Sequence, residues 1–257
     1  MATARDDIRA VAWSTLHDQL AYGVRNHVWV TGAAGGAPTE VAELRTGFIV
    51  EGVAWSPTDQ RVAIQATRKV PRSGRFPRFC SSVWTASASG GSVDLIREHQ
   101  EPGNGITWSP NGRWLALGVD GYNMSTPCSK KHPQYGLLRM HPDGSHLQSL
   151  HATFGRSPDW SPEGRRIVFD DWRHACHACG QVWVMRSNGR LQHKILGHGL
   201  GAQFYEPRWS PDGEEIAYVH NDLRSDNVDL WTMNDQGHNR HRVFSGSRAG
   251  PWIWPDW

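Results

Sequence analysis

The sequence predicts an all-β protein, a β-propeller built of four-stranded blades, and two observations carry this prediction. The first is a Trp-Ser-Pro-Asp-Gly-like turn that recurs five times, with a sixth copy beginning near the C-terminal end. The repeat tryptophans are Trp13, Trp55, Trp108, Trp160, Trp209 and Trp254. The second is that short apolar runs without a helical period follow each turn. A repeat of about 40 to 50 residues with four strand-like runs is typical of propeller blades.

Each turn joins the first strand of a blade to its second strand, and the fullest copy runs from Trp209 to Gly213. Proline fixes φ near the value of the first central turn position, Asp or Asn supports the turn, and Gly accepts a positive φ. The expected second strands contain Leu20–Tyr22, Val62–Ile64, Leu115–Leu117, Ile167–Phe169 and Ile216–Tyr218. The expected third strands contain Trp29, Trp84, Leu138, Trp183 and Trp231. The expected outer strands contain Leu44, Leu95 with Ile96, Leu147 with Leu150, Ile195 with Leu196, and Val243 with Phe244.

The repeats divide one domain, residues 1–257, into consecutive blades. Their approximate bounds are 8–48, 49–101, 102–153, 154–202 and 203–247, with a partial copy at 248–257. We expect five complete blades plus a C-terminal strand. The alternative is an incomplete six-bladed propeller. A chain of 257 residues can bury a sizeable core, and all-β units of this size are routinely single domains.

This pattern resembles the WD40-like (PD40) propeller repeats of the TolB family, whose blades have the same turn and an aromatic third strand. The resemblance covers about residues 8–257. It implies the fold rather than an activity, because the family includes protein-interaction modules, the propeller halves of prolyl oligopeptidase-like peptidases and a few lyases. Propellers of the TolB type usually have six blades, so five complete repeats are a departure.

The composition describes a soluble chain of nearly balanced charge. Lys and Arg number 27 against 25 Asp and Glu, for a formal net charge of +2, and the mean hydropathy is -0.57. This balance argues against binding to nucleic acid or membrane through the overall charge of the protein. No run approaches the roughly 18 apolar residues of a membrane span, and charged residues interrupt the first 30 residues where a signal peptide would be apolar. We therefore favour a cytoplasmic protein, the alternative being an exported protein in its mature form.

Long insertions between the second and third strands of blades two, three and four predict the binding face. They span about residues 66–82, 120–136 and 170–181, and loops that lengthen on one face of a repeat array usually mark its binding face. The expected binding residues are basic or aromatic: Arg68, Lys69, Arg72, Arg75, Arg78, Lys130, Lys131, Trp172 and Arg173. Such a rim suits a carboxylate, a phosphate or an acidic protein surface. The alternative is a set of solvated loops without a binding role.

All four cysteines lie in these insertions, and we expect none of them on a strand. They are Cys80, Cys128, Cys176 and Cys179. A Cys-x-x-Cys pair is a good half-site for zinc, and the other two thiols could complete a closed tetrahedral site, with His174 and His177 as alternate ligands. The alternatives are two disulfides, for instance Cys80 with Cys128, or four unlinked thiols. Zinc is the one cofactor that the sequence suggests.

The sequence contains no recognisable catalytic machinery. A Gly-x-Ser-x-Gly elbow, a His-Glu-x-x-His helix, a phosphate loop and a dinucleotide fingerprint do not occur. We interpret the chain as a non-enzymatic binding or scaffold module that presents the long loops of blades two to four to a protein partner or a small anionic ligand. Nucleic acid is a poor candidate partner because no recognised motif appears. The alternative is a metal-dependent or anion-binding enzyme, such as a lyase, with its site at the channel mouth.

Metal analysis and thiol titration of the native protein separate the three cysteine hypotheses. A closed zinc site predicts one zinc per chain and no titratable thiol until the metal is chelated, because four thiolates are bound. Two disulfides predict no zinc and no thiol until a reductant is added. Four titratable thiols without metal would contradict both.

Overall fold

The computed structural model describes residues 8–14, 16–70, 78–100, 105–119, 136–150, 155–172, 180–197 and 201–247. Within these ranges every regular element is a strand. No helix that could cross a membrane occurs in this part of the chain.

The strands form five four-stranded antiparallel sheets, each a meander in chain order. Blade one contains β1 (Ile8–Ser14), β2 (Gln19–Val24), β3 (His27–Gly32) and β4 (Thr39–Glu43). Blade two contains β5 (Phe48–Trp55), β6 (Arg61–Val70), β7 (Arg78–Ser87) and β8 (Val93–Gln100). Blade three contains β9 (Ile106–Trp108), β10 (Leu115–Val119), β11 (Gly136–Met140) and β12 (Gln148–Ser149). Blade four contains β13 (Gly155–Trp160), β14 (Arg166–Asp171), β15 (Gln181–Arg186) and β16 (His193–Leu196). Blade five contains β17 (Ala202–Trp209), β18 (Glu215–Asp222), β19 (Asn227–Asn234) and β20 (His241–Ser247).

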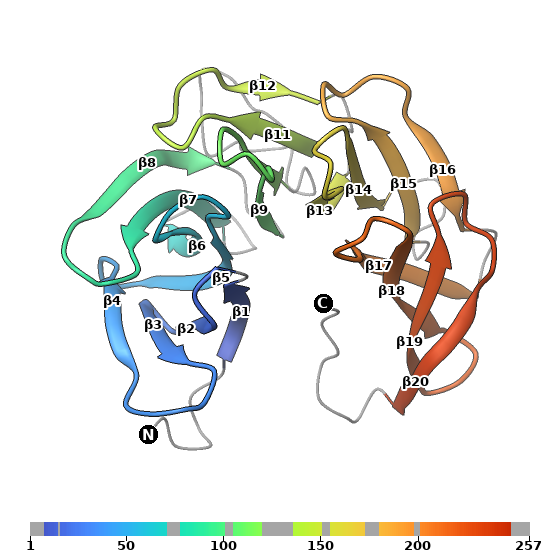
Figure 1. The fold of residues 1–257 in the computed structure, drawn as a ribbon, viewed down its shortest axis with the longest axis horizontal. Coiled ribbons are helices and arrows are strands. Elements are labelled where there is room, and N and C mark those ends of the chain that lie inside the picture. The colour runs from blue at the N-terminus through green and yellow to red at the C-terminus, as the bar shows by residue number, and fades with distance from the viewer. Residues whose placement is uncertain are drawn as a thin grey trace.

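The five sheets are arranged around a common axis, so the predicted β-propeller of four-stranded blades is confirmed (Figure 1). The first strands β1, β5, β9, β13 and β17 are innermost, and each contacts the first strand of the next blade. Blades one and five lie on either side of an opening in the arc of described strands (Figure 1). The C-terminal strand that the sequence predicts lies outside the described residues.

The structure explains the serine, the acidic residue and the glycine of the repeated turn. In blade five, the backbone N–H of Ser210 donates to the Glu215 carbonyl at 2.9 Å, and the Ser210 hydroxyl accepts the Glu215 N–H at 2.9 Å. The Asp212 carboxylate in turn accepts the hydroxyl proton of Ser210 at 2.5 Å. Gly213 has a φ of 75°, a left-handed conformation that favours glycine. The buried Ser210 therefore stabilises the hairpin by bonding to both Asp212 and Glu215.

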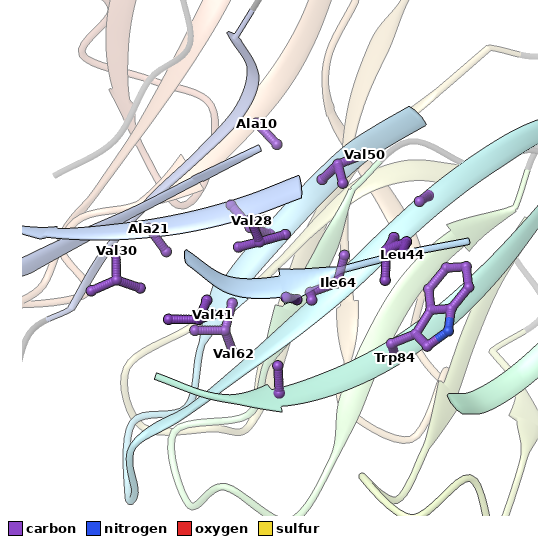
Figure 2. Packing of buried hydrophobic residues seen from close by; sticks show 14 of the residues in the cluster. Ala10, Ala21, Val28, Val30, Val41, Leu44, Val50, Val62, Ile64 and Trp84 are labelled. Carbon is purple, nitrogen blue, oxygen red and sulfur yellow. The ribbon is translucent and has the colours of Figure 1, made fainter. Parts of the chain in front are cut away.

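Blades pack through tryptophans at the ends of their first strands. The indole N–H of Trp55 donates to the carbonyl of Ala12 at 2.9 Å, and that of Trp108 donates to the carbonyl of Ala54 at 3.0 Å. Each acceptor is the residue before the repeat tryptophan of the preceding blade. Figure 2 shows the interface of blades one and two, where small and branched side chains fill the space between the sheets. Three further apolar clusters join blades two to three, three to four and four to five.

Blade two differs from the prediction in its long connection. The predicted insertion begins at residue 66, but β6 and β7 continue to pair from Ala66 with Ser82 as far as Val70 with Arg78. Cys80 therefore lies on a strand, which corrects the prediction that no cysteine does. The prediction was wrong because the polar residues that suggested a loop, such as Thr67, Ser81 and Ser82, are buried within the extended strand ladder.

Two glycines in equivalent third-to-fourth-strand turns test how tightly the blades pack. Gly90 and Gly237 have φ of 82° and 78°, so alanine at either position costs about 1–2 kcal/mol for the left-handed backbone. A Cβ at Gly237 would lie 2.1 Å from the carbonyl oxygen of Ile195, whereas the nearest atom at Gly90 is 3.6 Å away. Denaturant unfolding should therefore show that Gly237→Ala lowers the free energy of unfolding by at least about 1 kcal/mol more than Gly90→Ala. Equal losses would contradict the close packing of blades four and five.

Candidate functional site

The second strands of all five blades end on one side of the propeller, because every sheet is an antiparallel meander with the same polarity. We call this side the insertion face. The opposite side holds the Trp-Ser-Pro turns. The strand ends that define the insertion face are Val24, Val70, Val119, Asp171 and Asp222.

In blade two the insertion face contains a basic and aromatic arm. Arg68 and Lys69 lie near the end of β6 and pair across the ladder with Cys80 and Phe79. The Arg68 guanidinium lies 5.2 Å from the ring centre of Phe48, a cation–π geometry. Lys69 and Phe79 are exposed. Neither cation forms an ion pair with any described residue; Lys69 is exposed, and Arg68 is half-buried over the Phe48 ring.

The structure brings only some of the predicted rim together. Arg68, Lys69 and the backbone of Arg78 lie on the β6–β7 arm, while Trp172 belongs to a separate group at the end of β14. The remaining predicted binding residues lie outside the described residues: Arg72, Arg75, Lys130, Lys131 and Arg173. A single continuous rim therefore stays a prediction.

Trp172 is held between blades four and five. Its indole N–H donates to the Asp170 carboxylate, its ring centre lies 6.1 Å from that of Tyr205 on β17, and Arg156 on β13 lies 5.4 Å from the ring centre. An aromatic side chain fixed by three neighbours loses little conformational entropy on binding. Trp172 is thus a preorganised apolar surface at the insertion face.

Beneath Trp172 lies a buried carboxyl network that the sequence did not predict. Asp170 is fully enclosed and accepts the backbone N–H of Glu206 at 3.3 Å. The Glu206 carboxylate accepts the hydroxyl of Ser157 at 2.9 Å and pairs with Arg208 at 3.2 Å. Ser157 and Glu206 occupy the same position, three residues before their repeat tryptophans, with φ of 47° and 54°. The network therefore joins the first strands of two neighbouring blades at their bulges.

Burial raises the pKa of Asp170 to about 7, and the charge of Glu206 acts in the same direction. Hydrogen bonds from Ser157 and Trp172 and the charge of Arg156 oppose this shift. Near neutral pH the network therefore takes up or releases a proton. Because Asp170 is enclosed by protein, we interpret it as a residue that connects blades four and five.

One signal in the sequence could have revealed this network. The second strand of blade four reads Ile167-Val168-Phe169-Asp170-Asp171, whereas the position of Asp170 is Gly23, Gln65, Gly118 and Val219 in the other blades. A carboxylate at the end of an otherwise apolar strand needs partners in the next blade. Those partners are distant in sequence, so the pattern marks the anomaly without identifying them.

Cys80 is buried and disulfide-bonded, as the disulfide hypothesis expects for this residue. In this oxidised form its sulfur is not a thiolate ligand. The other three cysteines, with His174 and His177, lie outside the described residues. Zinc bound by all four cysteines therefore stays a prediction for the reduced chain.

One group of described residues has the spacing of metal ligands. The ligand atoms of His27 on β3 and of Glu40 and Glu43 on β4 lie within 4.8 Å of one another. His27 already pairs with Glu40 at 2.9 Å. An exposed histidine–carboxylate pair accounts for this geometry without a metal.

Comparison with known sequences finds partial matches. No family model matches the chain. It is 25% identical over 178 residues to a component of eukaryotic translation initiation factor 3 from Coccidioides immitis, covering 62% of this chain and 23% of that protein. It is 26% identical over 172 residues to an uncharacterized protein from Agrobacterium fabrum, covering 64% of this chain and 53% of that protein. A segment of 75 residues is 32% identical to the Tol-Pal system protein TolB from Nitratidesulfovibrio vulgaris, covering 29% of this chain and 16% of that protein. The chain thus spans about a quarter to a half of the length of the first two relatives.

Similarity to solved structures extends over nearly the whole chain. A putative TolB from Agrobacterium tumefaciens superposes with a TM-score of 0.71 at 22% identity, covering 94% of this chain and 82% of that one. A chain of the nidogen/laminin complex gives 0.67 at 12% identity, covering 95% and 81%. Oligogalacturonate lyase in complex with manganese gives 0.66 at 13% identity, covering 90% and 63%. The repeats and the sheets define a β-propeller with WD40-like blades. Within that class the fold is TolB-like, as the sequence motifs indicated.

The raised pKa of Asp170 predicts how stability depends on pH. The folded pKa of about 7 lies above the ordinary value of 3.8, so this group's contribution to stability is complete below the ordinary value and is lost as pH rises through about 7. One proton limits the slope to about 1.4 kcal/mol per pH unit. Asp170→Asn should remove this slope, which urea unfolding between about pH 4.5 and 8.5 would measure.

His220 provides the matched control, because burial lowers its pKa and its contribution to stability therefore increases with pH. His220→Asn should leave the decline assigned to Asp170 in place. Parallel stability curves for the wild type and Asp170→Asn would contradict the assignment.

Proposed function

We propose that this chain is a non-enzymatic binding module whose insertion face takes a protein partner or an anionic ligand. The observation that carries the proposal is the β6–β7 arm, where Arg68 and Lys69 have no acidic partner among the described residues and Phe79 is exposed beside them. Cations without acids, together with exposed aromatic area, favour an acidic surface or a carboxylate or phosphate group. The buried carboxyl network, in contrast, is satisfied internally.

The comparisons support a binding role through the fold. One of the similar structures comes from a complex of two proteins, nidogen and laminin, and others are TolB propellers. Because the identities are low, the likeness concerns the arrangement of blades, and the partner must be argued from the surface itself. Trp172, held by Asp170, Tyr205 and Arg156, adds a rigid apolar contact to that surface.

A lyase-like enzyme is the second candidate, and its support is the fold likeness to oligogalacturonate lyase in complex with manganese. Incubating the purified chain with oligogalacturonate and manganese, and following the unsaturated product, tests it directly. If each protein molecule forms many molecules of unsaturated product, the chain is an enzyme and the non-enzymatic proposal is wrong.

Charge reversal on the two sides of the propeller tests the binding role. The variant Arg68→Glu with Lys69→Glu changes the insertion face, and the control Arg113→Glu with Arg190→Glu makes the same change in charge on the exposed turns of the opposite side. The probes are polyglutamate and inorganic phosphate in titration calorimetry, and partners identified by mass spectrometry after capture on the full chain. Binding by the first variant should weaken at least about tenfold, and more at low salt, because opposite charges are lost.

The control variant should bind as the wild type does. Equal losses in both variants would indicate a general effect of net charge and contradict a site on the insertion face. Unchanged binding by the insertion-face variant would have the same consequence.

A further inference from the structure

Trp172 is held at the insertion face by groups from three strands that belong to two blades. It directly follows β14, and its side chain is half-buried. Its one polar group, the indole N–H, donates to the Asp170 carboxylate, while its ring faces Tyr205 on β17 and Arg156 on β13. Strands β13, β14 and β17 are in mutual contact (Figure 1). The bond to Asp170 is therefore the directional contact that orients this side chain.

The hydrogen-bond donors around Asp170 suit an ionised carboxylate. One oxygen accepts the backbone N–H of Glu206 at 3.3 Å, and the other accepts the indole N–H of Trp172. Ser157 is also within hydrogen-bonding reach of this carboxyl group, but its hydroxyl donates to the Glu206 carboxylate at 2.9 Å. A hydroxyl has a single proton to donate, although it can accept at the same time. Two carboxylates therefore compete for one hydroxyl proton.

An added proton has a defined place in this arrangement. When Asp170 is protonated, its O–H can donate to the Ser157 hydroxyl, which continues to donate to Glu206. The competition between the two carboxylates then ends. The indole bond of Trp172, however, loses its charge assistance, and hydrogen bonds to an ionised group are roughly twice as strong as those between neutral groups. Protonation therefore strengthens the link between the blades and weakens the bond that orients Trp172.

We propose that Trp172 is a proton-controlled element of the insertion face. While Asp170 is ionised, its carboxylate fixes the indole against blade five. When Asp170 takes up a proton, the indole is released from this position and becomes more accessible to solvent. The apolar surface at the end of β14 is therefore preorganised in one protonation state only. The effect on a partner rests on the proposed function, whereas the switch itself belongs to the two blades and is measured without a ligand.

The surrounding groups bring this response close to neutral pH. Burial is the main cause that raises the pKa of Asp170 to about 7, the charge of Glu206 adds to it, and the charge of Arg156 opposes it. On β15 the residue that pairs with Asp170 is an uncharged valine. The other titratable or charged groups at this end of the packed strands are, among the described residues, Asp171 on β14, Asp159 on β13, and Tyr205 and Arg208 on β17. Arg208 pairs with Glu206, and Asp171, as the next residue of an extended strand, points to the other face of β14.

Fluorine NMR of the full chain labelled with 5-fluorotryptophan measures the switch, with the Trp172 resonance assigned through Trp172→Phe. Between about pH 5.5 and 8.5, the wild-type resonance should move along a one-proton curve whose midpoint lies near the Asp170 pKa of about 7. A soluble paramagnetic gadolinium chelate should broaden this resonance more strongly at the low-pH end, because release exposes the indole.

Three variants assign the transition. Asp170→Asn has no titrating carboxyl group, so it should hold the resonance near its low-pH position at every pH. Glu206→Gln removes a charge that raises the Asp170 pKa, so it should lower the midpoint by about half a pH unit or more, and it keeps the test decisive if Asp170→Asn does not fold. His220→Asn is the control, because it removes a titrating group of blade five and should leave the Trp172 curve unchanged.

A Trp172 resonance with constant position and constant broadening over this pH range would overturn the proposal. A resonance that moves without any change in broadening would do the same, because the indole would then sense the charge without being released. An unchanged curve in either Asp170→Asn or Glu206→Gln, or loss of the curve in His220→Asn, would assign the transition to another group. Failure of the charge-reversal test on Arg68 and Lys69 would leave these readings unaffected, so the switch and the proposed function fail separately.

Discussion

The packing of the repeat tryptophans of blades two to five against the preceding blade is the interaction on which the rest of the structure depends. A four-stranded sheet buries too little apolar surface to be stable alone, so each blade requires a neighbour on both faces. Trp55 and Trp108 supply both the apolar area and a hydrogen bond to the preceding blade. In blades two and four an arginine adds a cation–π contact, since Arg61 lies 5.3 Å from the ring centre of Trp108 and Arg166 lies 4.5 Å from that of Trp209. Trp13 of blade one and Phe244 of blade five are exposed because no described strand covers them.

Polar groups on the insertion face are used in two different ways. Between blades four and five, Asp170, Glu206, Ser157 and Arg208 satisfy one another, and burial of Asp170 makes that contact sensitive to protonation. In blade two, Arg68 and Lys69 have no acidic partner among the described residues, and Lys69 is exposed. An internally paired charge stabilises a contact or controls it, whereas an unpaired cation is free to attract an anion from solution. This contrast favours blade two as the origin of the proposed binding function.

The disulfide at Cys80 lies on the same arm. Cys80 pairs across the ladder with Arg68, and its side chain is buried. A covalent link restricts the conformations open to the segment it joins. The arm is therefore presented by a fixed strand ladder, and a preorganised surface loses less entropy on binding. Function is therefore argued from such a surface and not from the fold alone.

The sequence by itself determined the fold. Six tryptophans at blade-length intervals, the Trp-Ser-Pro-Asp-Gly turns and the short apolar runs predicted four-stranded blades, and these signals are local, since each turn closes its own hairpin through residues such as Ser210 and Asp212. The sequence placed Arg68, Lys69 and Trp172 in the insertions between second and third strands, and the structure puts Arg68 and Lys69 on β6 itself. Its composition suggested the wrong position for Cys80, because a strand ladder rich in Ser and Thr has a composition similar to that of a polar loop.

The tertiary structure alone decided which side chains meet across blades. Asp170 reaches Glu206, 36 residues later, and Ser157 reaches the same carboxylate over 49 residues, so no local pattern pairs them. The exposure of Trp13 was likewise not evident from the sequence, because Trp13 and Ser14 match the Trp-Ser pair of its buried counterparts. Local sequence sets the conformation of each blade, but burial and charge pairing depend on the neighbour, and the neighbour is defined only when the blades assemble around the axis.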